Sequence, residues 1–214
     1  MARRPFTPPR WLRWVIFAAC LLPAIWLGAA FVSDFFQGTR YLGSNPIETM
    51  EHFSGRWILR FLVLTLSITP LRWTLGWNWL QRYRRMFGLF AFFYACIHLS
   101  TYFSLDLEFY WAEITEDILE RPYITIGMTA FLLLVPLAVT STKGMIRRLG
   151  KRWVKLHRLI YVIVVLGTIH FWMSVKADFR EPLLYATIFA VLLGARVWRS
   201  RAKRATTVAV PRRA

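Results

Sequence analysis

The chain is poor in acidic residues and in cysteine. Its 214 residues include 11 Asp and Glu and two cysteines, Cys20 and Cys96, each inside an apolar run. There is no CxxC pair, no glycine-rich nucleotide fingerprint and no cluster of metal-ligating residues in the polar segments. These absences argue against a dithiol redox centre and a nucleotide-binding domain within the chain. The two cysteines are expected to be small packing residues rather than a disulfide.

The sequence also has no segment long and polar enough for a soluble domain, and no internal repeat is evident. The longest polar connections are 33–52 and 104–121, and the region beyond Trp198 is short and basic. We therefore expect a cytoplasmic basic tail over 1–11, one transmembrane domain over 12–198, and a second cytoplasmic basic tail over 199–214. The composition of the second tail predicts that it lacks regular structure.

Hydrophobic residues dominate the rest of the chain. They make up 57% of it, and aromatic residues 17%. A transmembrane helix needs roughly 20 mostly apolar residues to cross a hydrocarbon core of about 30 Å. Six segments meet this requirement, which predicts an all-α membrane protein built as a six-helix bundle. They span 12–32, 53–71, 86–105, 122–141, 153–173 and 182–198.

The distribution of charge supports six helices and predicts their orientation. If both termini are cytoplasmic, 22 of the 28 Lys and Arg lie on the cytoplasmic side and all 11 acidic residues lie on the other. This satisfies the positive-inside rule. The net charge of +17 is therefore interpreted as a topology signal, and we expect no nucleic-acid partner. Arg3 and Arg4 precede the first apolar run as in a secretory signal, but we expect a retained helix because the run has 20 uncharged residues.

Two histidines lie at matching depth in the predicted membrane. His98 is 13 residues beyond Arg85, and His170 is 12 residues beyond Arg158. On helices that run in the same direction, each imidazole is then about 18–20 Å above the inner boundary. Two imidazoles at one depth can ligate a haem between them and give a one-electron carrier. The alternative is that each histidine hydrogen-bonds to a neighbouring helix.

A third histidine, His157, lies near the inner surface, where the matching position on the other helix is Arg85. It is a candidate ligand of an inner haem, or an interfacial histidine. The surrounding basic stretch is an alternative site for a flavin or lipid phosphate. Candidates for binding a flavin phosphate at the inner surface are basic: Arg84, Arg85, Lys151, Arg152 and Lys155.

Three cationic residues follow one face of the second segment. His52, Arg56 and Arg60 are spaced i, i+4, i+8 and enter the outer leaflet. Haem propionates or a quinone head group would be suitable partners. The alternative is that the arginines extend to water or pair with Glu48 or Glu51.

Several motifs resemble those of a known family. They are HFSGRW (52–57), ITPLR (68–72), YRRMFGL (83–89), IHLSTY (97–102), RPYITIG (121–127), TSTKGMIRRLGKRWVKLHRLIY (140–161) and IHFWMSVK (169–176). Together they resemble the MsrQ (YedZ) family, haem-binding membrane subunits of the periplasmic methionine sulfoxide reductase system, over about residues 12–198. That family is similar to the ferric reductase transmembrane domain.

The resemblance implies a haem b protein of the bacterial inner membrane with one or two haems, associated with His98, His157 and His170. It also implies electron flow from the quinol pool, or from FMN with a cytoplasmic flavin reductase, to a periplasmic molybdopterin reductase, MsrP. That partner reduces methionine sulfoxide in oxidised proteins, and nothing in this chain is suited to that reduction. The alternatives are a ferric or superoxide-forming reductase, another transmembrane cytochrome b, and a non-redox transporter or scaffold that uses the histidines for proton relay or packing.

Overall fold

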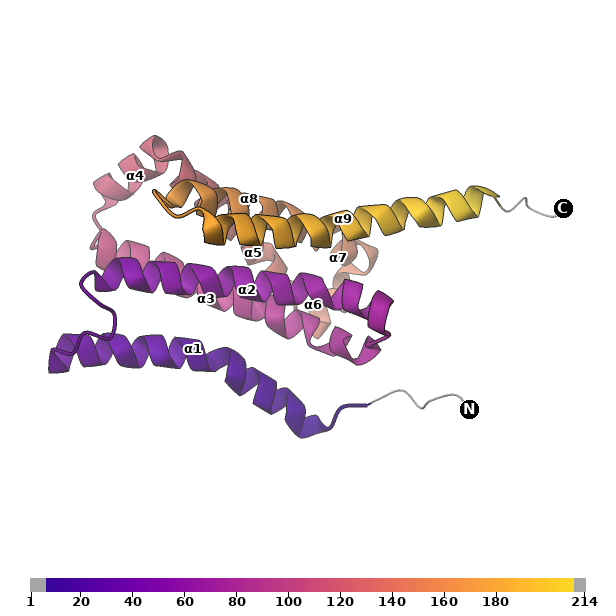
Figure 1. The fold of residues 1–214 in the computed structure, drawn as a ribbon, viewed down its shortest axis with the longest axis horizontal. Helices are drawn as coiled ribbons and strands as arrows, with labels where there is room; N and C mark the ends of the chain where they lie inside the picture. Colours follow the sequence, from indigo (N-terminus) through magenta and orange to yellow (C-terminus); the bar gives the residue numbers. More distant parts are fainter. Residues whose placement is uncertain (1–6, 210–214) are drawn as a thin grey trace.

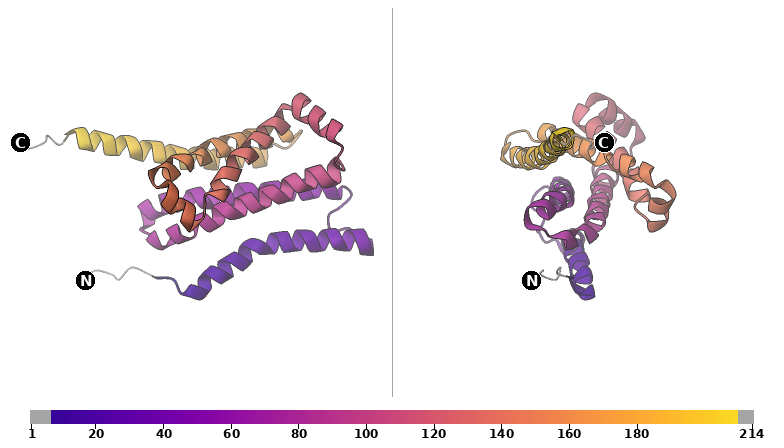
Figure 2. Two further views of the ribbon diagram at one scale, coloured as in Figure 1. Left: turned by 180° about the vertical axis from the view of Figure 1, so that it is seen from behind. Right: turned by 90° about the vertical axis from the view of Figure 1, so that its right-hand side faces the viewer.

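The computed structural model describes residues 7–209, with side chains up to residue 202. Long helices run side by side and form an elongated bundle (Figure 1, Figure 2). The long helices are α1 (Arg10–Gln37), α2 (Pro46–Leu75), α3 (Arg84–Thr101), α5 (Pro122–Val139), α8 (Leu159–Ser174) and α9 (Arg180–Ala209). Short elements connect them: η1 (Asn78–Arg82), η2 (Tyr102–Asp106), α4 (Trp111–Glu120), α6 (Lys143–Leu149) and α7 (Lys151–Leu156).

The prediction of an all-helical protein with six membrane-spanning helices is confirmed. Six helical stretches in the described residues are long and apolar enough to cross a bilayer, and they contain nearly all of the six predicted segments. The described residues contain no strand. The cytoplasmic placement of the termini stays a prediction.

Helix α2 begins earlier than its apolar pattern indicates. The Asn45 side chain accepts a hydrogen bond from the backbone N–H of Glu48, and Pro46 occupies the first turn. These capping signals add seven residues before the predicted start at residue 53. His52 therefore lies in the second turn of α2 and not at its beginning.

Two further boundaries differ from the predicted ones. The fifth segment is interrupted at His157 and Arg158, between the end of α7 and the start of α8. The tail beyond Trp198, expected to be irregular, continues α9 as far as Ala209, while 210–214 lie outside the described residues. The expectation of an irregular tail is thus wrong up to Ala209, since Arg, Lys and Ala are good helix formers.

The core lies where α2 packs along α3 and α5 packs along α8. Phe61 and Leu66 of α2, Tyr94 of α3 and Val164 of α8 are almost completely buried. The rings of Phe61 and Tyr94 stack with centroids 5.3 Å apart. Helix α9 covers this core from the side of α2 and α8 (Figure 1). Because lipid supplies no hydrophobic driving force between helices, such close aromatic packing holds the bundle together.

Helix α1 lies at the edge of the bundle and bends in its middle (Figure 1, Figure 2). The bend coincides with Pro23, which cannot donate the helical hydrogen bond and disturbs the preceding turn. Next to this bend, the Tyr94 hydroxyl donates a hydrogen bond of 3.0 Å to the backbone carbonyl of Cys20. Cys20 and Cys96 are both free, as predicted.

We predict that Tyr94→Phe destabilises the protein by about 1–2 kcal/mol, because a buried carbonyl loses its hydrogen bond where water cannot replace it. The midpoint of thermal unfolding in detergent should fall by a few degrees. Tyr41→Phe is the matched control, since Tyr41 is 65% exposed. Equal midpoints for the two variants would contradict the role of this hydrogen bond.

Candidate functional site

A cavity of about 320 Å³ lies between α2, α3, α5 and α8. His98 of α3 and His170 of α8 both line it, while His157 does not. The remaining walls are mostly apolar, with His52, Arg56 and Tyr123 among the polar lining residues. The structure thus brings together the two histidines that the sequence places at one depth.

The two imidazoles lie close together at this cavity. Their ring centroids are 6.2 Å apart and their planes are nearly perpendicular, at 85°. A metal–imidazole bond is about 2 Å and the nitrogen lies about 1.2 Å from the ring centre, so rings on opposite sides of one iron have centres roughly 6.4 Å apart. The observed separation fits two axial ligands of a single haem iron.

Hydrogen bonds fix which nitrogen of each ring is available. His98 Nδ1 lies 3.1 Å from the carbonyl oxygen of Glu51, and His170 Nδ1 lies 2.7 Å from that of Tyr123. A carbonyl only accepts, so each Nδ1 carries the proton and donates. Each Nε2 therefore keeps the lone pair that a metal ligand needs.

A serine supports the first of these contacts. The Ser54 side chain is completely buried and its Oγ lies 3.2 Å from His98 Nδ1. Its hydroxyl donates to the carbonyl of Met50 at 2.7 Å. The Ser54 oxygen is thus free to share the imidazole N–H with the Glu51 carbonyl.

Glycines let both imidazoles approach the neighbouring backbone. A Cβ atom on Gly127 would lie 2.7 Å from His170 Nδ1, which is too close for any side chain. On Gly55 it would lie 3.6 Å from His98 Cε1, an ordinary van der Waals contact. In each case the glycine follows the residue whose carbonyl accepts the hydrogen bond, Glu51 or Tyr123, by one helical turn.

These contacts reveal a repeat that the sequence analysis missed. Each histidine lies 47 residues after the residue whose carbonyl it contacts and 43 residues after the glycine. The whole set recurs at an offset of 72 residues: Glu51, Gly55 and His98 correspond to Tyr123, Gly127 and His170. The α2–α3 and α5–α8 hairpins therefore build equivalent halves of one site. In the sequence, the repeat consists of a Gly followed 43 residues later by the His of an Ile-His dipeptide. Three residues so far apart are too few to be recognised as a repeat without the contacts.

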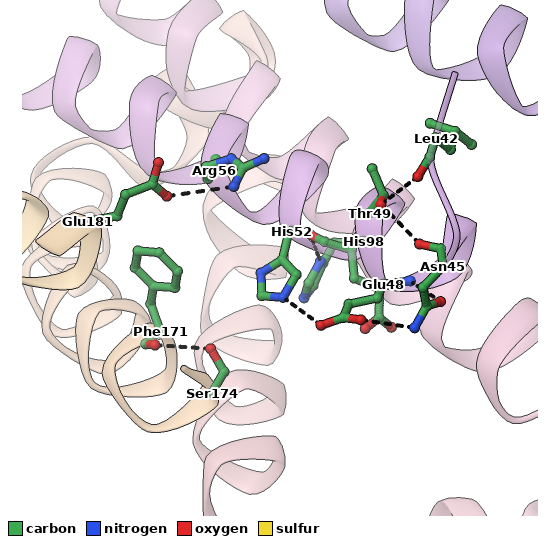
Figure 3. Close-up of polar contacts among 11 residues, drawn as sticks. Leu42, Asn45, Glu48, Thr49, His52, Arg56, His98, Phe171, Ser174 and Glu181 are labelled. Atoms are coloured by element: carbon green, nitrogen blue, oxygen red, sulfur yellow. Dashed lines mark hydrogen bonds and ion pairs between the residues drawn. The ribbon is translucent and has the colours of Figure 1, made fainter. Parts of the chain in front are cut away.

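The cationic stripe on α2 is divided by the structure. His52 and Arg56 line the cavity, and Arg56 pairs with Glu181 of α9 at 3.6 Å (Figure 3). His52 Nε2 lies 3.6 Å from Glu48 (Figure 3). Arg60 is not among the cavity-lining residues, and its guanidinium lies 4.6 Å from the Trp57 ring centroid. The pairing partner of Arg56 is thus Glu181, and not Glu48 or Glu51 as considered from the sequence.

His157 occupies a different environment. It stacks on Trp153 with centroids 3.9 Å apart, and its Nδ1 lies 3.1 Å from the Trp153 carbonyl. Its Nε2 is buried close to the backbone of Leu137. A ligand of His157 would have to displace one of these two backbone contacts.

The inner basic residues do not all line one site. Arg85 lines a groove between α1 and α3, which Lys151, Arg152 and Lys155 do not line. Arg84 instead lies close enough to His157 and Arg196 for its positive charge to act on both side chains. Neighbours in sequence, Arg84 and Arg85 therefore face different surroundings.

The chain is similar in sequence to known proteins. A family model described as a ferric reductase like transmembrane component matches residues 54–168. The protein-methionine-sulfoxide reductase heme-binding subunit MsrQ of Xanthomonas euvesicatoria pv. vesicatoria is 52% identical over 193 residues, which are 90% of this chain and 88% of that protein. The MsrQ subunit of Rhodospirillum rubrum is 53% identical over 186 residues, 86% of each chain. No solved structure matches.

If His98 and His170 bind haem, Gly127→Ala should disturb binding far more than Gly55→Ala. The methyl group at residue 127 must displace the His170 ring, whereas the one at residue 55 has room. We expect haem content per protein to fall by about tenfold in Gly127→Ala, comparable to the loss of an outer-shell partner of a metal ligand. The pyridine haemochrome assay measures it. Similar haem content in the two variants would contradict the role of Gly127.

Proposed function

The chain belongs to the MsrQ family of haem-binding subunits, within the ferric reductase-like transmembrane proteins, and we propose that it carries electrons across the bacterial inner membrane to a periplasmic methionine sulfoxide reductase. The observation that carries the proposal is the close pair His98 and His170. Haem b bound between them supplies reversible one-electron transfer between ferric and ferrous iron.

The residues around the cavity serve this role by holding the ligands in place. The Glu51 and Tyr123 carbonyls fix the tautomer and orientation of both rings. Apolar side chains of α2, α5 and α8 exclude water from the ring edges. Two histidines held in this way would favour electron transfer by a bound haem over binding of a substrate to its iron.

The reduction itself requires a second protein. Methionine sulfoxide takes up two electrons and two protons to give methionine and water, whereas the pair His98 and His170 supports one-electron steps. We propose a periplasmic molybdopterin-containing subunit, MsrP-like, that accepts the electrons one at a time and reduces the sulfoxide. A multi-pass membrane chain with both termini in the cytoplasm presents the His98–His170 half of the bundle toward that partner.

Arg56 and His52 are suited to the carboxylates of the outer haem. Both line the cavity, and the Arg56 side chain is held between it and Glu181. Arginine pairs favourably with a propionate carboxylate. Arg60 is less suited, since it packs on Trp57.

We predict that His98→Ala and His170→Ala each lower haem content at least tenfold, because an axial ligand matters more than an outer-shell partner, whose loss costs about 10–100-fold in affinity. The α band of the dithionite-reduced protein reports the loss. A variant pair that keeps full haem would show that these histidines are not ligands.

His157→Ala distinguishes one haem from two. If His157 Nε2 ligates an inner haem, the variant should keep about half of the haem, with the spectrum of the outer site unchanged. If the chain binds only the outer haem, the content should equal that of the parent protein. Pyridine haemochrome content and redox titration of the purified protein separate these results.

The electron donor is proposed to be quinol, with reduced FMN from a cytoplasmic flavin reductase as the alternative. No nucleotide fingerprint is present in the chain, whereas His52, which lines the cavity, is a suitable proton acceptor for a quinol. Stopped-flow reduction of the haem in proteoliposomes compares quinol with reduced FMN plus the reductase. Haem reduction within seconds by flavin but not by quinol would replace quinol with flavin as the donor.

A further inference from the structure

A second opening lies at the other end of the bundle from the histidine pair. It is a groove of about 870 Å³ between the first turns of α1 and the start of α3. Four arginines line it: Arg10 and Arg13 from α1, and Arg82 and Arg85 at the start of α3. Helices distant in sequence thus direct four positive charges toward one space.

The arginines lack protein counter-charges. The ion pairs among the described residues are His52–Glu48, Arg56–Glu181 and Arg121–Asp117. No Asp or Glu occurs before Asp34 or between residues 52 and 105. An anion from outside the chain is the natural partner for this cluster.

The walls of the groove are apolar and uncovered. Trp14, Phe17, Leu89 and Phe93 line it and are 71%, 42%, 37% and 38% exposed. On both helices the apolar residues follow the arginines by one to two turns, so they lie deeper in the predicted membrane. The groove is therefore cationic at the membrane surface and apolar toward the hydrocarbon core.

The bend in α1 borders this space. Tyr94 ties the helix to α3 at Cys20, and Phe17 packs on Phe90 of α3 with ring centroids 5.2 Å apart. Before these contacts the N-terminal end of α1 turns away from the bundle (Figure 1).

We propose that this groove binds one anionic phospholipid, with its phosphate on the four arginines and an acyl chain along Trp14, Phe17, Leu89 and Phe93. Basic pockets between transmembrane helices on the cytoplasmic side suit such head groups. The positive-inside rule accounts for arginines at this surface, but not for their convergence above an uncovered apolar channel. The proposal does not depend on haem binding.

The test uses the full-length haem-loaded chain in detergent, titrated with dioleoylphosphatidylglycerol, dioleoylphosphatidylcholine or FMN. Native mass spectrometry counts bound molecules. The variant Arg13→Gln/Arg85→Gln is compared with Arg147→Gln/Arg148→Gln, which removes the same charge from exposed residues of α6. Far-ultraviolet circular dichroism and the midpoint of thermal unfolding verify that each variant is folded.

We expect the parent and the α6 variant to retain one phosphatidylglycerol at least about tenfold more tightly than phosphatidylcholine, and Arg13→Gln/Arg85→Gln to lose about 10–30-fold in affinity for it. Brominated phosphatidylglycerol should quench less tryptophan fluorescence in Trp14→Phe than in the parent. An equal loss of affinity for phosphatidylglycerol in both double variants would show that only the general surface charge matters, and would overturn the site. Displacement of the lipid by micromolar FMN would also overturn it, in favour of a flavin site.

Discussion

The candidate site depends on one constraint: an imidazole inside a bilayer must hydrogen-bond its N–H within the protein. His98 meets it on α2, through the Glu51 carbonyl, and His170 meets it on α5, through the Tyr123 carbonyl. These carbonyls belong to helices, where the side chain one turn later normally covers them. Gly127 leaves the Tyr123 carbonyl accessible to His170, whereas a methyl group on Gly55 would make only an ordinary contact with His98. The hydrogen bonds of the two histidines therefore fix the orientation of each ring and also join α3 to α2 and α8 to α5.

The same set of contacts occurs twice, and this explains why His98 and His170 lie close together. Two hairpins with the same contacts and the same direction place their histidines at equal depth beside the same cavity. The correspondence fails at the inner surface, where the counterpart of His157 is Arg85. Arg85 instead lines the groove against α1, and His157 packs on Trp153. The half of the bundle around the cavity thus has equivalent surroundings for His98 and His170, whereas in the other half the equivalent positions, Arg85 and His157, have different surroundings.

The sequence alone predicts the parts of this structure that depend on local properties. Apolar length and flanking charge predict six helices, and counting from Arg85 and Arg158 predicts that His98 and His170 share a depth. The contacts between distant residues are not predictable in this way. The Arg56–Glu181 pair joins α2 to α9, and the spacing of His52, Arg56 and Arg60 does not show that Arg60 packs on Trp57. The start of α2 differs from the predicted one for another reason. The capping residue Asn45 marks it, and the apolar pattern begins only several residues later.

The match to the ferric reductase-like family covers residues 54–168, which run from α2 into α8 and leave out α1 and α9. The matched range includes His98 but ends two residues before His170. Helix α9 contributes Glu181, which holds Arg56 beside the cavity.

Helix α1 contributes Arg10, Arg13 and Trp14 to the groove. Its contact with the core is centred on the Tyr94–Cys20 hydrogen bond and the buried residues beyond Pro23. A lipid held in the groove would fill the space between α1 and α3, so it would stabilise the attachment of α1 without touching the histidine pair. The proposed haem site and the proposed lipid site thus lie at opposite ends of the same bundle.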